Sequence, residues 1–142
     1  MMEIKELEQK ENETLLNFIE RVRDMHQNLF PDVTFMSQIA KFDEEYNEMI
    51  EATKYIAEEP DKFLEELADM FIVACGILRF NEALGYCLCK SIADDFIYKE
   101  DDAGNNYLSE LTIKIIEKMN KNIKRVWSKT TDGNYKHVSY LN

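Results

Sequence analysis

The sequence predicts an all-α fold, built as a single domain over residues 1–142 in an antiparallel bundle of four to five helices. The 142-residue chain is long enough to bury one sizeable core. It contains only four Gly and two Pro, too few for the many tight turns of an all-β fold. Apolar residues also recur at helical spacing, and a hydrophobic content of 45% with 32% charged residues is typical of a globular protein.

The first predicted helix covers residues 3–29, where apolar positions follow the period of an α-helix. These positions are Leu15, Phe18, Ile19, Val22 and Met25. The pair Phe30-Pro31 should end this helix, because the residue before a proline resists the α conformation. A second helix is expected over residues 37–58.

A third helix is predicted over residues 61–81, with Pro60 suited to its first turn. Apolar residues occupy nearly its whole circumference, so it should lie at the centre of the bundle or at a subunit contact. The chain should then break around Gly85, before a fourth helix over residues 86–98.

The polar stretch 99–106 follows, and it lacks the alternating acid ligands of an EF-hand loop. A solvated turn is therefore expected there.

The last long helix should cover residues 107–127, with apolar residues along one side. The tail after Ser128 should be irregular or form a short hairpin around Asp132-Gly133.

Two of the predicted helices repeat one arrangement of carboxylates. Glu45 and Glu48 are three residues apart and lead into an apolar stripe, and Glu66 and Asp69 repeat this pattern in the next helix. Residues three and four apart share a helix face, so each pair should lie on the side that faces the core. The short connection between the two helices should make them antiparallel neighbours.

Ionised carboxylates on an inward face are costly unless a cation meets them. Ligands that are all oxygen atoms suit Mg²⁺, with Mn²⁺ as a possible substitute, so the four carboxylates predict a metal site. The Glu-x-x-His pairs of di-iron bundles are missing, which disfavours redox iron. The alternative is a solvated acidic face.

Charge is unevenly distributed along the chain, whose net charge is −11. Residues 1–110 carry 10 Lys and Arg against 26 Asp and Glu, whereas residues 111–142 carry 7 against 2. The acidic total disfavours general binding to nucleic acid or to anionic membranes. The basic end should either neutralise the acidic body or face an anionic ligand held beside it.

The chain lacks the features of an exported or membrane-spanning protein. Its first residues are too charged for a secretory signal, and its longest apolar run, residues 70–78, is too short to span a bilayer. The three cysteines, Cys75, Cys87 and Cys89, form neither an even set nor a zinc motif. We expect free thiols and a cytoplasmic location.

Lys118, Asn122 and Arg125 follow one another at positions i, i+4 and i+7 of the last predicted helix. Together they would present a cation, an amide and a guanidinium, which suit a phosphate and a sugar or base. The alternative is simple pairing of a basic helix with the acidic body. Trp127 could stack on a base, but packing on the core is the favoured interpretation, and packing or surface roles are favoured for His26 and His137.

The acidic motif Glu44-Glu45-Tyr-Asn-Glu48, followed by Glu66-Leu-Ala-Asp69, resembles the signature of the MazG-like all-α nucleoside triphosphate pyrophosphohydrolases. The stretch KMNKNIKRVW, residues 118–127, looks like the basic helix of that family, and residues 132–138 are similar to the tail of small members. The resemblance covers residues 36–82 and 114–138. Residues 87–107 exceed the compact family pattern, so we expect them to be an insertion that could alter oligomer geometry or substrate choice.

The resemblance implies a Mg²⁺-dependent enzyme that splits a nucleoside triphosphate into a monophosphate and pyrophosphate. By position, Glu45, Glu48, Glu66 and Asp69 would be metal ligands. Glu44 and Glu45 would be the catalytic residues, with Glu44 as an outer carboxylate or as the base for the attacking water. A homodimer or homotetramer is also implied.

The nucleotide base and sugar stay open at this point. A dUTP- or dCTP-directed diphosphatase with the same acidic core is a near alternative to a broader role in nucleotide-pool house-cleaning. A non-catalytic helical interaction module is the alternative from another class. Carboxylates on the apolar stripe would favour an enzyme, and carboxylates opposite it would favour the module.

Overall fold

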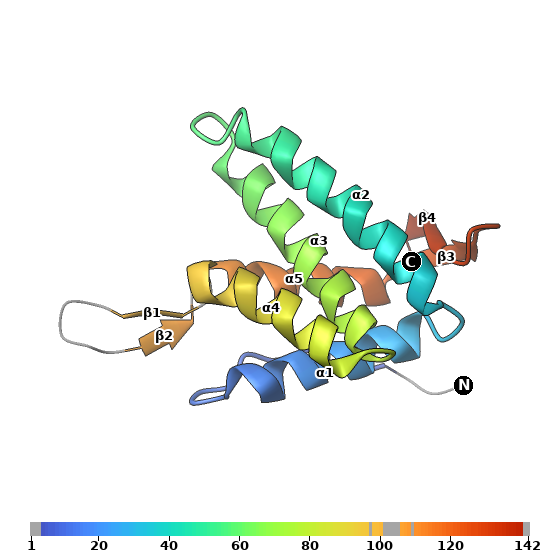
Figure 1. Cartoon of the computed structure of the whole chain (residues 1–142), viewed down its shortest axis with the longest axis horizontal. Coiled ribbons are helices and arrows are strands. Elements are labelled where there is room, and N and C mark those ends of the chain that lie inside the picture. The colour runs from blue at the N-terminus through green and yellow to red at the C-terminus, as the bar shows by residue number, and fades with distance from the viewer. Residues whose placement is uncertain (1–3, 97, 101–105, 109, 141–142) are drawn as a thin grey trace.

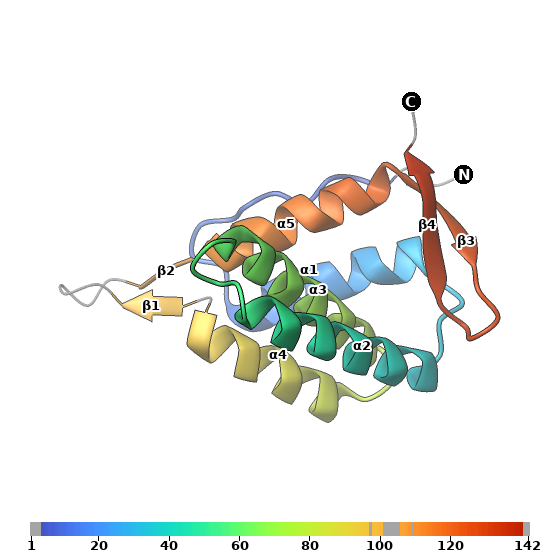
Figure 2. The same cartoon turned by 90° about the horizontal axis from the view of Figure 1, so that it is seen from above.

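The computed structural model describes residues 4–96, 98–100, 106–108 and 110–140. Within these ranges it has five helices, which confirms the predicted all-α bundle (Figures 1 and 2). The helices are α1 (Leu15–Leu29), α2 (Phe35–Thr53), α3 (Pro60–Leu78), α4 (Glu82–Phe96) and α5 (Glu110–Ile123). Two small antiparallel hairpins accompany them: β1 (Tyr98–Glu100) with β2 (Asn106–Leu108), and β3 (Arg125–Lys129) with β4 (Tyr135–Tyr140).

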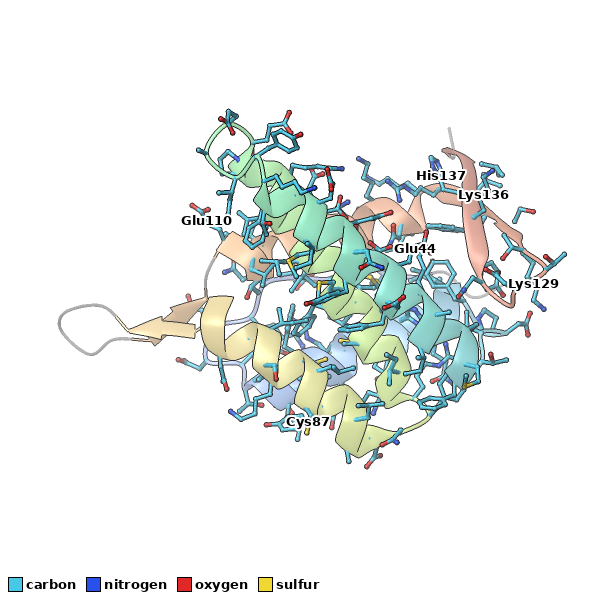
Figure 3. The ribbon with its side chains drawn as sticks, turned by 45° about the horizontal axis from the view of Figure 1, so that its top comes forward. Glu44, Cys87, Glu110, Lys129, Lys136 and His137 are labelled. Atoms are coloured by element: carbon cyan, nitrogen blue, oxygen red, sulfur yellow. The ribbon has the colours of Figure 1, made fainter. Side chains whose placement is uncertain are left out.

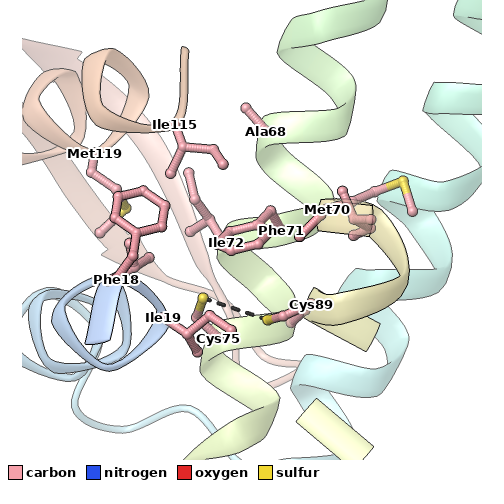
Figure 4. Close-up of a cluster of buried hydrophobic side chains, with 14 of the residues drawn as sticks. Phe18, Ile19, Ala68, Met70, Phe71, Ile72, Cys75, Cys89, Ile115 and Met119 are labelled. Carbon is pink, nitrogen blue, oxygen red and sulfur yellow. Dashed lines mark hydrogen bonds between the residues drawn. The ribbon is translucent and has the colours of Figure 1, made fainter. Parts of the chain in front are cut away.

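Helix α3 is the central element, as its apolar sequence predicts. It contacts α1, α2, α4 and α5, and every residue from Met70 to Leu78 is buried. Its side chains interleave with those of the surrounding helices in one core cluster, part of which is shown in Figure 4. Among the largest fully buried side chains are Ile19 of α1, Phe71 of α3, and Ile115 and Met119 of α5.

Helices α2 and α3 form an antiparallel pair joined by a short turn (Figure 1). A capping box begins α2, because Ser37 N donates to Thr34 Oγ1 and Thr34 N donates to Ser37 Oγ. The helix ends at Thr53, five residues before the predicted end. There the Thr53 hydroxyl donates to Ile50 O, a local bond that competes with the helical pattern.

Helix α1 begins at Leu15, so the prediction of a helix from residue 3 is wrong. Residues 4–14 are instead tied to α5 through Asn120, whose side chain accepts from Leu7 N at 2.7 Å and donates to Leu7 O at 3.1 Å. Asn12 has a φ of 58°, and Thr14 caps the helix by accepting from Asn17 N. A contact between residues 113 positions apart thus overrides the local helical pattern.

Gly85 does not break the chain as predicted, because α4 starts at Glu82 and includes it. Asn81 starts the helix instead, accepting from Leu84 N. A Cβ at Gly85 would lie 2.5 Å from Leu78 backbone atoms, so the glycine permits the close approach of α3 and α4. The helix ends at Phe96, and β1 and β2 occupy parts of the stretch expected to be a solvated turn; residues 101–105 of that stretch lie outside the described residues.

The last helix is also shorter than predicted, since α5 spans residues 110–123 and Arg125 and Trp127 belong to strand β3. The Trp127 indole donates from Nε1 to Asn122 O, which satisfies a carbonyl at the helix end. The register of β3 against β4 shifts between Val126 and Trp127. Extended residues with a bulge therefore replace the last turn of the predicted helix.

The hairpin predicted around Asp132-Gly133 is confirmed as the β3–β4 turn. Gly133 has a φ of 87°, a conformation that favours glycine, and Asp132 Oδ1 accepts hydrogen bonds from Asn134 N and the Thr130 hydroxyl. The turn packs on the start of α2, beside Ser37. Across the described parts of the chain, the helices are too short or too polar to cross a membrane.

Candidate active site

Three of the four predicted ligands come together between α2 and α3. Carboxylate oxygens of Glu45, Glu48 and Glu66 all lie within 4.8 Å of one another. Glu45 and Glu66 are buried, whereas Glu48 lies on the exposed side of the cluster. Glu45 and Glu48 share a face of α2 because they are three residues apart, and the antiparallel pairing brings Glu66 of α3 opposite them.

The two buried carboxylates are only partly satisfied. Glu45 Oε1 lies 3.4 Å from Lys41 Nζ, and Glu66 Oε1 lies 2.9 Å from Lys62 Nζ. Within the described residues, the second oxygens, Glu45 Oε2 and Glu66 Oε2, are buried without a hydrogen-bond partner. A buried carboxylate oxygen without a partner is unfavourable, so the cluster is suited to an additional positive charge.

The pKa of Glu45 reflects the free-energy cost of burying its carboxylate. Burial is the largest cause, and with the charges of Asp69 and Glu48 it raises the pKa of Glu45 to about 8 despite the opposing charge of Lys41. A carboxyl group with such a pKa is mostly protonated at neutral pH in the protein alone. It would become a full carboxylate when a cation displaced the proton.

Asp69, the fourth predicted ligand, lies beside the trio and outside it. Its Oδ2 is 3.5 Å from Lys118 Nζ of α5. Burial raises the pKa of Asp69 to about 6, the positive charge of Lys118 opposes that shift, and the charges of Glu66 and Glu48 add to it. Asp69 is therefore within electrostatic reach of the cluster and links it to the basic part of the molecule.

A cavity of about 520 Å³ runs from Glu45 and Asp69 to the β3–β4 hairpin. In Figure 3, Glu44 lies on the side of α2 that faces the β3–β4 hairpin, which carries Lys136 and His137. Its lining combines residues from several elements with both signs of charge. The ionisable Asp, Glu, Lys and Arg residues in the lining are Lys41, Glu44, Glu45, Asp69, Lys118, Arg125, Asp132 and Lys136.

Lys118, Asn122 and Arg125 all line this cavity, as predicted, although they do not share one helix face. Lys118 and Asn122 lie on α5, and Arg125 reaches the cavity from β3. Arg125 Nη1 donates to Asn122 Oδ1 at 3.3 Å, so the hairpin and the helix end hold each other in place. The three residues that the sequence singled out thus line one cavity, but the helical structure predicted for Arg125 is wrong.

The end of the cavity nearer the hairpin is aromatic. The Phe30 and Trp127 rings meet edge to face with centroids 4.8 Å apart, and Tyr135 lies 5.1 Å from Phe30. Trp127 is half-buried and lies outside the main core cluster, and it packs on the buried ring of Phe30. His26 is buried against Phe30 and His137 lies beside Trp127, which accords with the packing roles expected for the histidines.

Sequence reasoning missed several residues of the cavity wall. Lys41 could have been found, because it lies four residues before Glu45 and one helical turn brings them together. Gln38 and Asn134 gave no local signal, because they are 96 residues apart and meet only through docking of the hairpin on α2.

Glu44 is exposed at the edge of the cavity, where its carboxylate lies 3.5 Å from Lys41 Nζ. Lys41 contacts Glu45 as well, so one ammonium group bridges the two residues predicted to be catalytic. Glu44 is therefore near the acidic cluster without being part of it, as expected of an outer carboxylate.

Comparison of the chain with models of known protein families gave no match, and comparisons with curated proteins and with solved structures gave no significant match either. The basis for a functional assignment is thus the geometry of the carboxylate cluster and of the cavity that it adjoins at Glu45, with the basic wall and the aromatic end of that cavity.

Proposed function

We propose that the protein is a Mg²⁺-dependent nucleoside triphosphate pyrophosphohydrolase that releases a nucleoside monophosphate and pyrophosphate. The observation that carries this proposal is the continuity of one cavity from Glu45 and Asp69, past the basic side chains of Lys118, Arg125 and Lys136, to an aromatic end. A nucleoside triphosphate has matching parts: a polyanion that needs cations, and a flat base that stacks on aromatic rings.

The donor set fits magnesium. Glu45, Glu48 and Glu66 offer hard oxygen ligands within a small volume, and two of them have buried oxygens without partners. Asp69 lies outside this trio, but the charges of Glu66 and Glu48 act on its carboxyl group. Bound there, Mg²⁺ would neutralise charge on the phosphates and make a water molecule more acidic.

The basic residues of the cavity would hold the triphosphate. Arg125 can grip a phosphate through two parallel N–H donors, whereas Lys118 and Lys136 act as point charges. Their positive charges favour the extra negative charge that develops on pyrophosphate as it leaves. Lys118 also keeps Asp69 oriented toward the cavity through their ion pair.

Glu44 is placed to move the proton. Its carboxylate is exposed at the cavity edge and held near Lys41, so a water between Glu44 and a bound phosphate could give its proton to a Glu44 oxygen. The oxygen of that water would then bond to phosphorus as the bond to the pyrophosphate oxygen breaks. The Glu44 carboxyl group afterwards releases the proton to solvent.

The position of the acids favours an enzyme over a non-catalytic interaction module. A module would display its carboxylates on the outer surface, opposite the apolar stripe, whereas Glu45 and Glu66 are 6% and 5% exposed. Buried carboxylates without full pairing lower stability, and a binding function explains their presence better than a structural one.

The direct test is pyrophosphate release from a panel of deoxynucleoside and ribonucleoside triphosphates, including dUTP and dCTP, with Mg²⁺ or with EDTA. We expect turnover of at least one nucleotide with Mg²⁺ and none with EDTA. Glu48→Gln and Asp69→Asn should reduce turnover by about 100-fold. The matched control is Glu51→Gln, an exposed residue of α2 one turn after Glu48.

Absence of cleavage of every triphosphate by folded wild-type protein would favour the interaction module. Unchanged turnover in Glu48→Gln and Asp69→Asn would show that the catalytic centre lies elsewhere. A strong preference within the panel for dUTP or dCTP would identify the narrower diphosphatase as the correct version of the proposal.

A further inference from the structure

Lys41 of α2 lies between two parts of the proposed site. Its Nζ is 3.5 Å from Glu44 Oε2 and 3.4 Å from Glu45 Oε1. The two glutamates follow Lys41 by three and four residues, so one helical turn brings both side chains to the same ammonium group. The lysine also lines the cavity. One cation thus contacts the carboxylate proposed to accept a proton and a carboxylate proposed to hold the metal.

The buried glutamate of α3 has a lysine at the same spacing, but the two lysines differ in position. Lys62 Nζ lies 2.9 Å from Glu66 Oε1, four residues further along the helix. The Lys62 side chain is 56% exposed, whereas that of Lys41 is 33% exposed. Within the described residues, Lys41 lines the cavity and Lys62 does not. An exposed lysine outside the cavity is therefore enough to offset a buried glutamate, and the position of Lys41 indicates a further role.

Glu44 needs an anchor if it is to accept the proton. Its side chain is 59% exposed, and an exposed glutamate can occupy several rotamers. Proton transfer requires the carboxylate to lie within hydrogen-bonding reach of the attacking water, and a small misplacement of a reacting group lowers the rate strongly. Among the described residues, the ion pair with Lys41 is the contact that restrains this carboxylate.

Lys41 is itself anchored by Glu45. The Glu45 side chain is 8% exposed, so packing restricts its carboxylate, and the ammonium group of Lys41 is held against it. An ion pair between two exposed side chains would impose little order. Here the chain of ion pairs runs from a buried glutamate through Lys41 to Glu44, so the position of Glu44 depends on the position of a proposed metal ligand.

We propose that Lys41 is a positioning residue, which holds the Glu44 carboxylate at a fixed place beside the carboxylate cluster so that Glu44 can accept the proton of the attacking water. The inference rests on the proposed function for the reaction. It adds a residue that affects turnover through Glu44 and not through contact with the phosphates.

A double-mutant cycle tests whether Lys41 acts through Glu44. The reaction is pyrophosphate release from the best-cleaved triphosphate with saturating Mg²⁺, measured for wild type, Lys41→Met, Glu44→Gln and the double variant. We expect Lys41→Met to lower kcat by about 10- to 100-fold and to change KM by less than about threefold. In the Glu44→Gln protein, which lacks the proton acceptor, the same replacement should lower kcat by less than about twofold.

Two further variants separate positioning from the offset of buried charge. Lys41→Arg keeps a cation of similar reach and should retain kcat within about fivefold of wild type. Lys62→Met is the matched control, because it removes the lysine at the same spacing that lies outside the cavity. It should retain kcat within about threefold of wild type.

Binding of Mn²⁺ without nucleotide gives a readout that does not depend on turnover. Lys41→Met removes a positive charge beside Glu45, so the variant should bind Mn²⁺ at least as tightly as wild type. Weaker binding would show that Lys41 acts by shaping the metal ligand, and would overturn the positioning of Glu44 as its role.

Equal losses of kcat from Lys41→Met in the wild-type and Glu44→Gln backgrounds would overturn the proposal, because the lysine would then act without Glu44. Equal effects of Lys41→Met and Lys62→Met on kcat would also overturn it. Both outcomes leave the hydrolase in place. If wild-type protein cleaves no triphosphate, the hydrolase itself fails and the role of Lys41 fails with it, so the two failures are distinguishable.

Discussion

Lys118 Nζ of α5 lies 3.5 Å from Asp69 Oδ2 of α3, and this ion pair joins the acidic half of the cavity to its basic half. Both side chains are mostly shielded from solvent, with 18% and 30% of their surface exposed. Because Lys118 opposes the rise in the pKa of Asp69, the lysine favours the anionic form of that carboxyl group next to the carboxylate cluster.

Replacement of Lys118 by methionine should impair the site in two ways. The pKa of Asp69 should rise further above about 6, and the triphosphate should lose a positive contact. We expect kcat/KM to fall by about 10- to 100-fold, with an optimum shifted to higher pH. Lys121→Met on the exposed side of α5 is the control, and equal pH profiles for Lys118→Met and wild type would contradict the role assigned to the ion pair.

Glu45→Gln should stabilise the metal-free protein while removing its response to magnesium. The pKa of Glu45 in the folded protein is raised to about 8 from its ordinary value of 4.5, so ionisation of Glu45 opposes folding as the pH rises between these two values. Near pH 8 with EDTA, we expect the variant to gain about 1–2 kcal/mol in the free energy of unfolding.

Urea unfolding with EDTA and with excess Mg²⁺ measures both effects. Wild type should gain stability with Mg²⁺, and Glu45→Gln should gain little. Glu51→Gln, whose carboxylate is exposed, should behave as wild type in both conditions. A lower stability of Glu45→Gln in EDTA would show that the ionised carboxylate is better satisfied than the structure indicates.

Buried His26 should make the protein sensitive to acid. Its pKa is about 3 in the folded protein and should be near 6.5 in the unfolded chain, so the unfolded state binds more protons between these values. Stability due to the neutral ring is complete above about pH 6.5 and decreases by about 1.4 kcal/mol per pH unit below it.

The difference in unfolding free energy between wild type and His26→Phe isolates the contribution of His26. The carboxyl groups whose pKa values are raised, Glu45 and Asp69, are present in both proteins and cancel in this difference. We expect wild type to lose stability relative to the variant as the pH falls from 6.5. A difference that does not change with pH would place the folded-state pKa of His26 near its ordinary value.

The N-terminal segment offers a test of the fold. Asn120→Ala removes both hydrogen bonds that hold Leu7 to α5 and leaves two backbone groups to find other partners. We expect a loss of about 1–3 kcal/mol, measured by thermal or urea unfolding, together with faster amide exchange in residues 4–14. The exposed Asn28→Ala in α1 is the control. Unchanged exchange would show that Asn120 does not anchor the segment.

The sequence was informative where the signal is local. Helical spacing predicted the bundle and the central place of α3. The spacing of carboxylates three residues apart singled out Glu45, Glu48, Glu66 and Asp69, of which the first three come together and Asp69 lies beside them. Pro60 correctly marked the start of a helix.

The failures at the N-terminal segment and at the end of α5 have the opposite cause, because both depend on a contact distant in the sequence. Asn120 draws residues 4–14 out of the predicted helix, and pairing of β3 with β4 converts Arg125 and Trp127 to extended structure. Gly85 was interpreted as a breaker although its role is to allow α3 and α4 to touch. No single-sequence pattern reports such approaches.

The central claim is that the cluster of Glu45, Glu48 and Glu66 holds a divalent cation. Electron paramagnetic resonance of Mn²⁺ tests it most directly, because the free ion gives a signal that largely disappears on binding. We predict that wild-type protein near pH 8 binds Mn²⁺, that Mg²⁺ competes for the site, and that Glu45→Gln and Glu66→Gln bind weakly while Glu51→Gln binds normally. Equal Mn²⁺ binding by Glu45→Gln, Glu66→Gln and wild type, or no binding by any of them, would contradict the account.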